Sequence, residues 1–263
     1  MERLKRCLSG RHTPGEIRWH LAALAVVYWG LVFCAWLGYN TGRPYSITGE
    51  MLSALGSFDD HQNPQWFWIF TVAMVYCGLI MTPVMFYVYR RFAAVSPWGA
   101  RVGAFFFLLG CAGIVFTGLF PYGHGRAFGV WPWRKLHMSA GATIAVGFSL
   151  GFFWHAMLLL KDRITGATLR ERGDVSYARM ASPFLVCVPL LGTIAYRLNW
   201  PAAFSALHAA VTGSSEAASE QLHASFVRLH HFPLLEHMSI WALTIFVIWF
   251  TAVLPHRLEP EEE

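Results

Sequence analysis

The sequence is poor in charged residues. Only 13% of its 263 residues are charged, about half of the roughly 25% found in soluble domains. Apolar residues make up 56%, with 12 Trp and 21 Phe among them. A soluble core of this length cannot bury so much apolar surface, whereas a lipid bilayer can. The composition therefore excludes an ordinary soluble domain.

Short metal-binding and redox motifs are also missing. The sequence contains no CxxC, HExxH or HxxxH pattern, so any metal or acid–base site has to be assembled from distant segments. Cysteines number five, and all but Cys7 lie inside apolar runs. This argues against a disulfide framework and favours buried small side chains.

Six apolar runs are long enough to cross the ~30 Å of hydrocarbon in a bilayer. They predict an all-α fold, a single six-helix membrane domain spanning residues 1–263. The predicted spans are Leu21–Tyr39, Trp66–Tyr89, Val102–Phe120, His137–Leu160, Met180–Tyr196 and Leu234–Leu254.

The loop charges predict an orientation. Fourteen of the 20 Lys and Arg residues lie in the N-terminal segment, the C-terminal tail and the loops 90–101 and 161–179. The positive-inside rule places this side in the cytoplasm, with both termini. We expect a multi-pass protein of a bacterial inner membrane. The net charge of +5 then reflects membrane topology, so lipids rather than nucleic acids are the expected partners.

The two longer outer loops are expected to contain short capping helices. In the first, Gly49–Leu55 reads as an interfacial helix ended by Gly56. In the last, Pro201–Val211 and a second segment through His231 read as helices lying on the outer face.

Histidine marks the expected functional face, because eight of the 12 histidines fall on the outer side. Ionisable groups at membrane depth are costly and indicate function. Imidazole and carboxylate groups suit acid–base chemistry or a divalent metal such as Zn²⁺. The candidate catalytic residues are Ser53, Asp59, Asp60, His137, Glu236 and His237. The candidate metal ligands are His124, His137, Glu236 and His237.

Two alternatives remain open. His137 and His155 are eighteen residues apart, five helical turns, and so share one face of the fourth span. With His237 and His20 opposite them, they could hold two haems as in a b-type electron carrier. The other alternative is a non-catalytic scaffold that organises lipids.

Two stretches resemble a known family. Ser53-Ala54-Leu55-Gly56 and Asn63-Pro64 precede the second span, and Phe120-Pro121 precedes His137, with Glu236 opening the last span. This order is similar to six-span DRAM/Sfk-type membrane proteins and their bacterial relatives. The resemblance implies six helices with a polar centre facing outward. It assigns that centre to Ser53, Asp59 or Asp60, His137 and Glu236, and implies no established reaction.

Overall fold

The computed structural model describes residues 2–39, 42, 44–127, 129–166, 169, 176–197 and 232–254, and this part of the chain is mostly helical. The elements are α1 (Glu2–Leu8), α2 (Pro14–Leu37), the 3₁₀ helix η1 (Leu52–Gly56), α3 (Phe67–Ala93), α4 (Pro97–Leu119), β1 (Arg126–Ala127), β2 (Trp131–Pro132), α5 (Trp133–Thr165), α7 (Tyr177–Arg197) and α10 (Phe232–Val253). The all-α prediction is confirmed for this part of the chain, and the two strands add only a minimal antiparallel hairpin of two residues each.

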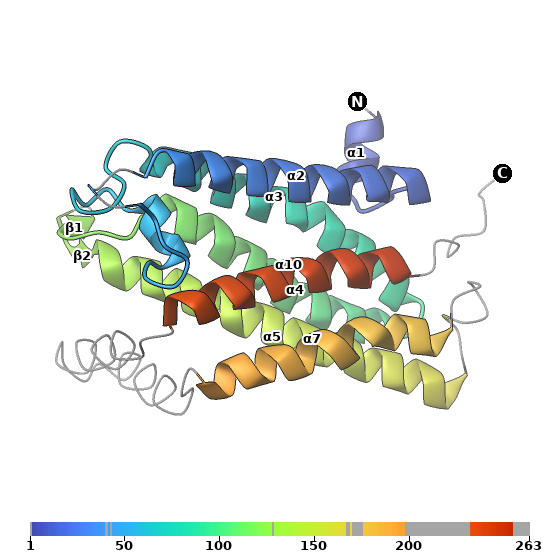
Figure 1. The fold of residues 1–263 in the computed structure, drawn as a ribbon. Helices are drawn as coiled ribbons and strands as arrows, with labels where there is room; N and C mark the ends of the chain where they lie inside the picture. The colour runs from blue at the N-terminus through green and yellow to red at the C-terminus, as the bar shows by residue number, and fades with distance from the viewer. Residues whose placement is uncertain are drawn as a thin grey trace.

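Five helices are long and apolar enough to cross a membrane: α2, α3, α4, α5 and α10. This agrees with an integral membrane protein. The expected fifth span, Met180–Tyr196, corresponds to α7, which is not one of these five. Figure 1 shows α7 running alongside α5 and α10, so it belongs to the same bundle.

The helices extend beyond the apolar runs because capping residues, not hydropathy, decide where they begin. The Thr13 side chain accepts a bond from the Glu16 backbone N–H, and the Glu16 carboxylate accepts from the Thr13 N–H, a complete capping box. In α4, the Ser96 side chain accepts from Gly99 N–H. A proline follows each cap, at a position that suits the first turn of a helix.

Glycines bring α4 and α5 close together, as the Gly147-x-x-x-Gly151 spacing indicates. A Cβ on Gly147 would lie 2.4 Å from the backbone nitrogen of Gly110, and one on Gly151 would lie 2.4 Å from Phe107 Cδ1. No side chain fits at either position, which is the usual basis of close helix approach in membranes.

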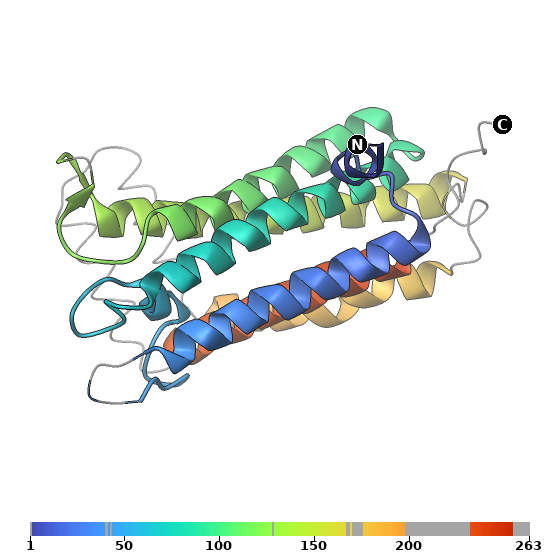
Figure 2. The same cartoon turned by 90° about the horizontal axis from the view of Figure 1, so that it is seen from above.

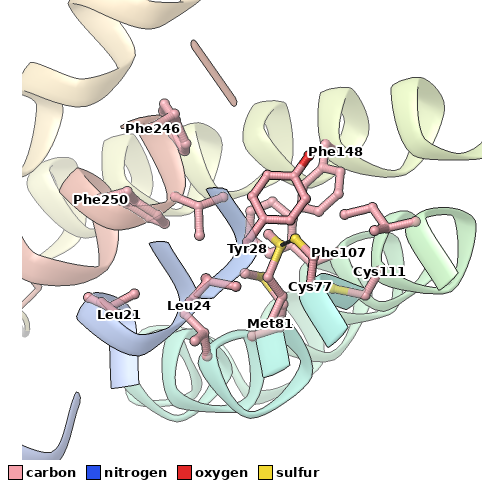
Figure 3. Packing of buried hydrophobic residues seen from close by; sticks show 14 of the residues in the cluster. Leu21, Leu24, Tyr28, Cys77, Met81, Phe107, Cys111, Phe148, Phe246 and Phe250 are labelled. Carbon is pink, nitrogen blue, oxygen red and sulfur yellow. Dashed lines mark hydrogen bonds between the residues drawn. The ribbon is translucent and has the colours of Figure 1, made fainter. Parts of the chain in front are cut away.

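The interior of the bundle is aromatic and sulfur-rich (Figure 3). Phe107 and Phe246 are almost fully buried. Cys77 and Met81 bring sulfur atoms into the same core, 3.6 Å apart. Large apolar side chains on the outside, such as Leu185 of α7 at 71% exposure and Phe153 of α5 at 62%, suit contact with lipid.

The bundle has two distinct ends (Figure 1). The loop end holds η1, β1 and β2, and the terminal end is where α2 begins and α10 ends. At the loop end, the predicted helix Gly49–Leu55 is replaced by η1. Its boundaries were wrong because Gly56 is the last residue of this tight turn rather than a stop after it. The predicted capping helices 201–211 and 214–231 lie outside the described residues.

Candidate functional site

The first feature of the loop end is the contact between η1 and the first turns of α10. The carboxylate of Glu236 accepts a hydrogen bond from the backbone N–H of Leu52 at 2.9 Å. The Ser53 backbone N–H donates to the same group. The first N–H groups of a helix have no backbone acceptor within the helix. Glu236 supplies the acceptor for two of these groups in η1. All five residues of η1, Ser53 included, are buried.

The residue after Glu236 makes a second contact with the same loop. His237, 3% exposed, donates from Nδ1 to the Pro233 carbonyl at 2.7 Å. In the neutral ring its Nε2 then carries the lone pair, and this atom lies 2.7 Å from the Tyr45 hydroxyl. One histidine nitrogen is thus fixed by the backbone, while the other faces a phenol.

The Tyr45 hydroxyl also lies 3.1 Å from the Met51 carbonyl, which precedes η1. Burial raises the pKa of Tyr45, and the nearby Glu236 carboxylate raises it further. The phenol therefore stays protonated and is a donor. With three acceptors in reach, it can donate to His237 Nε2 or turn to the loop carbonyls of Met51 and Glu50.

Asn63, 1% exposed, holds the other side of η1. Its amide donates to the Leu55 carbonyl at 2.7 Å and to the Ala35 carbonyl near the end of α2 at 3.3 Å. The Asn63-Pro64 motif thus has a structural role, because it ties the 3₁₀ helix to the first span.

His137 is buried at the start of α5 and binds the preceding loop. Its Nδ1 donates to the Phe120 carbonyl at 2.8 Å, and its ring meets the edge of Tyr122 at 5.6 Å. Burial raises the pKa of Tyr122; the Arg134 charge opposes this shift, and Asp59 and Glu236 reinforce it. Both carboxylates therefore act on Tyr122 at the loop end, where Glu236 binds η1 and Asp59 binds His124.

Asp59 pairs with His124 rather than with the buried groups. One carboxylate oxygen lies 2.8 Å from His124 Nδ1, and the other accepts the His124 backbone N–H at 3.1 Å. The His124 side chain is 90% exposed, and Asp60 is exposed as well. The pair joins two loops, with the His124 ring in solvent and the Asp59 side chain, 15% exposed, largely shielded.

The predicted residues are thus brought together in part. Glu236, His237 and Ser53 meet at η1, Asp59 meets His124, and His137 binds its own loop. Sequence reasoning missed Tyr45 and Tyr122, because nothing in their neighbourhoods distinguishes them from ordinary interfacial tyrosines.

Within the described residues, one group of three candidate metal ligands has its donor atoms within 4.8 Å of one another: Cys7, His12 and His20. The predicted outer set of His124, His137, Glu236 and His237 is not such a group, so metal binding by it stays a prediction. The short spacing Cys7-x₄-His12-x₇-His20 was the missed signal.

His155 and His20, which the haem alternative names, each bind a backbone carbonyl through one ring nitrogen. The His155 ring stacks on Phe107 at 4.6 Å and meets the edge of Phe92 at 4.9 Å. Its Nδ1 donates to the carbonyl of Gly151 at 2.7 Å. His20 directs one ring nitrogen to the Ile80 carbonyl at 2.8 Å. His155 Nε2 has no hydrogen-bond partner among the described residues, so the haem alternative stays a prediction.

Comparison with known proteins finds no matching family model, curated protein or solved structure. The chemistry of this chain therefore has to be argued from its own residues.

Proposed function

We propose that this chain is an integral membrane protein whose Tyr45–His237–Glu236 centre binds, or acts on, a lipid or another membrane-soluble molecule. The observation that carries the proposal is the 2.7 Å contact between His237 Nε2 and the Tyr45 hydroxyl. A backbone-fixed imidazole beside a half-buried phenol is a suitable pair for binding a hydroxyl group and accepting its proton.

The roles follow from the contacts. His237 accepts a proton at Nε2, because Nδ1 is committed to the Pro233 carbonyl. Tyr45 donates a hydrogen bond to this nitrogen and can turn to the Met51 carbonyl when the hydroxyl of a ligand takes its place. Glu236 is a positioning residue: it holds η1, and with it Ser53, against α10.

The location favours a membrane-soluble ligand over a water-soluble one. The centre joins the first turns of α10, a helix apolar enough to span a bilayer, to a buried loop. The side chains of Trp66 and Trp68, at the start of α3, are exposed. Exposed tryptophans are typical of the lipid headgroup level. A lipid headgroup is the polar group that most readily reaches this depth.

The test compares molecules that co-purify with the protein in detergent, using native mass spectrometry and lipid extraction. Tyr45→Phe removes one hydroxyl and His237→Gln removes the imidazole, whereas His61→Gln is a matched change of an exposed loop histidine. We expect the bound fraction to fall about fivefold to tenfold in the first two, since one hydrogen bond contributes about 1 kcal/mol. Identical bound molecules in all four proteins would refute the proposal.

A second candidate function is a non-catalytic scaffold that organises lipids. It is favoured by the hydrogen bonds that Glu236 and His137 make to backbone groups, since such contacts stabilise loops without taking part in a reaction. Under this alternative, Tyr45→Phe and His237→Gln leave the bound lipids unchanged and only lower thermal stability.

We further propose that α7 is a sixth span, which returns the C-terminus to the side of the N-terminus in the cytoplasm of a bacterial cell. Its support is its 21-residue length and the exposed apolar side chains of Leu185 and Val186. The resemblance to DRAM/Sfk-type proteins also implies six spans. Reporter fusions at the two termini should report the same compartment; opposite compartments would exclude six spans.

A further inference from the structure

The N-terminal segment folds back on the terminal end of the bundle and brings three potential metal ligands together. Cys7 lies on α1, His12 in the connection that follows, and His20 in the second turn of α2. Their candidate ligand atoms all lie within 4.8 Å of one another. Figure 2 shows α1 beside the last turns of α3, clear of the loop end.

The turn that creates this arrangement is tightly built. Gly10 has a φ of +72°, and a Cβ at this position would lie 2.4 Å from the carbonyl carbon of Phe86. The side chain of Arg90 donates to the Ser9 carbonyl at 2.7 Å. Only glycine fits such a close approach to the α3 backbone at positive φ. The segment is therefore docked on α3.

Charged contacts fix α1 to the start of α2 as well. The Arg6 guanidinium donates to both carboxylate oxygens of Glu16 at 2.9 Å. The same carboxylate completes the capping box with Thr13. Both bonds come from the same nitrogen, Nη2, and they hold α1 against the start of α2. Cys7, the residue after Arg6, lies with its Sγ 3.8 Å from His20 Nδ1 on α2.

His20 is held with a free lone pair directed at the thiol. One ring nitrogen, Nε2, lies 2.8 Å from the Ile80 carbonyl and donates to it. The other, Nδ1, is then unprotonated and lies 3.8 Å from Cys7 Sγ. A backbone carbonyl that fixes the tautomer of a histidine is the usual outer partner of a metal ligand.

His12 supplies an independent observation. Its side chain is 7% exposed, and within the described part of the chain its Nε2 has no hydrogen-bond partner. Its ring centre lies 5.1 Å from that of His20. A buried ring nitrogen without a partner is costly, and a cation shared with Cys7 and His20 would satisfy it.

We propose that Cys7, His12 and His20 together bind one divalent transition-metal ion of the zinc class. One thiolate and two imidazoles form a donor set that Zn²⁺ accepts in tetrahedral geometry. Three protein ligands leave a fourth position for water or another ligand. When the ion binds, the Cys7 thiol loses its proton to solvent and a sulfur–metal bond forms.

Positive and negative side chains around the site have opposite effects on the charge state of its ligands. Arg6 and Arg91 act on His12 with positive charge, and Glu16 acts with negative charge. Burial, reinforced by Glu16, raises the pKa of the Cys7 thiol. Metal binding has to overcome this preference for the neutral thiol, because the thiolate is the ligand.

Cobalt(II) is the probe, because a Co²⁺–thiolate bond gives a charge-transfer absorption band that reports sulfur ligation. The full chain, reduced, purified in detergent and freed of any affinity tag, is titrated with Co²⁺ and then with Zn²⁺ in competition. We expect one Co²⁺ per chain, a thiolate band, and displacement by Zn²⁺.

The variants identify the ligands. Cys7→Ala should abolish the thiolate band, and His12→Ala should weaken Co²⁺ binding by more than the ~10–100-fold typical of losing an outer partner. The matched controls are Cys34→Ser, an exposed cysteine on α2, and His61→Ala, an exposed loop histidine at the loop end. Both controls should bind like the parent protein. No stoichiometric binding by the parent protein, or a thiolate band that survives Cys7→Ala, would overturn the proposal.

Discussion

The two ends of the bundle use similar side chains in different ways. At the loop end, Glu236 and His137 each bond to the backbone of a neighbouring loop. At the terminal end, His20 bonds one α3 carbonyl and presents its second nitrogen to Cys7. His12 there is buried with a ring nitrogen that has no partner among the described residues.

The difference shows that position on the outer face is not enough to assign chemistry. A buried polar atom that binds a backbone group stabilises the fold, and its removal is expected to cost stability. Polar atoms that instead face one another can bind a ligand. Tyr45 and His237 form such a pair at the loop end, and the Cys7 group is its counterpart at the terminal end.

The largest expected effect is at Glu236. Replacing it with Leu leaves the Leu52 N–H, on a buried residue, without its acceptor at 2.9 Å. We expect the free energy of unfolding to fall by about 3 kcal/mol, because the Leu52 and Ser53 N–H groups both lose their acceptor and a buried donor without a partner costs about 1–3 kcal/mol. Denaturant unfolding in detergent micelles, followed by tryptophan fluorescence, measures this loss.

Glu236→Gln is the matched control, because its side-chain oxygen can still accept the same bond. It should cost roughly 1 kcal/mol and preserve the Co²⁺ site at the opposite end. Equal stability losses for Leu and Gln would show that Glu236 does not support η1 through this hydrogen bond.

The next largest effect is at Gly10, where the terminal end depends on a close backbone approach. Gly10→Ala introduces a Cβ 2.4 Å from Phe86 at a φ of +72°. We expect a loss of about 2 kcal/mol from backbone strain, faster proteolysis of the N-terminal segment and weaker Co²⁺ binding. Limited proteolysis together with the cobalt titration measures both consequences.

Gly15→Ala is its counterpart, because a Cβ at Gly15 meets nothing within 4 Å and the residue lies in the first turn of α2. It should leave the terminal end intact and stabilise it by up to about 1 kcal/mol, since alanine favours the helix. If Gly10→Ala behaved like Gly15→Ala, the docking of the N-terminal segment on α3 would be wrong.

The smallest effect is expected at His124, the exposed partner of Asp59. His124→Ala removes an ion pair whose histidine side chain is 90% exposed. Such pairs contribute no more than about 0.5–1 kcal/mol, so the unfolding midpoint should hardly move. A large destabilisation would mean that the Asp59–His124 contact, and not Glu236, organises the loop end.

Much of the fold could be predicted from the sequence because a helix that crosses a bilayer needs about 20 consecutive apolar residues. Each of the predicted runs overlaps a helix of the structure, from Leu21–Tyr39 in α2 to Leu234–Leu254 in α10. The ends shifted by several residues because Thr13 and Ser96 cap helices outside the apolar runs. Hydropathy does not register such caps.

The candidate site could be predicted only in part. Glu236 and His237 stand out because they are ionisable residues at the edge of an apolar run. Their partner Tyr45 lies 192 positions from His237 in sequence, and no spacing rule reaches that far. Ser53 joins them only because η1 folds onto α10, which depends on tertiary packing.

By itself, the sequence determined that this chain is an apolar helical bundle and placed its helices, because apolar length and capping are local properties. The tertiary structure alone decided which polar groups meet. Helix packing pairs Glu236 and His137 with backbone groups. It also brings His237 next to Tyr45, and brings Cys7, His12 and His20 together. The physical reason is that hydrogen-bond and ligand geometry depends on ångström distances between segments, which helix packing and tight turns such as that at Gly10 establish.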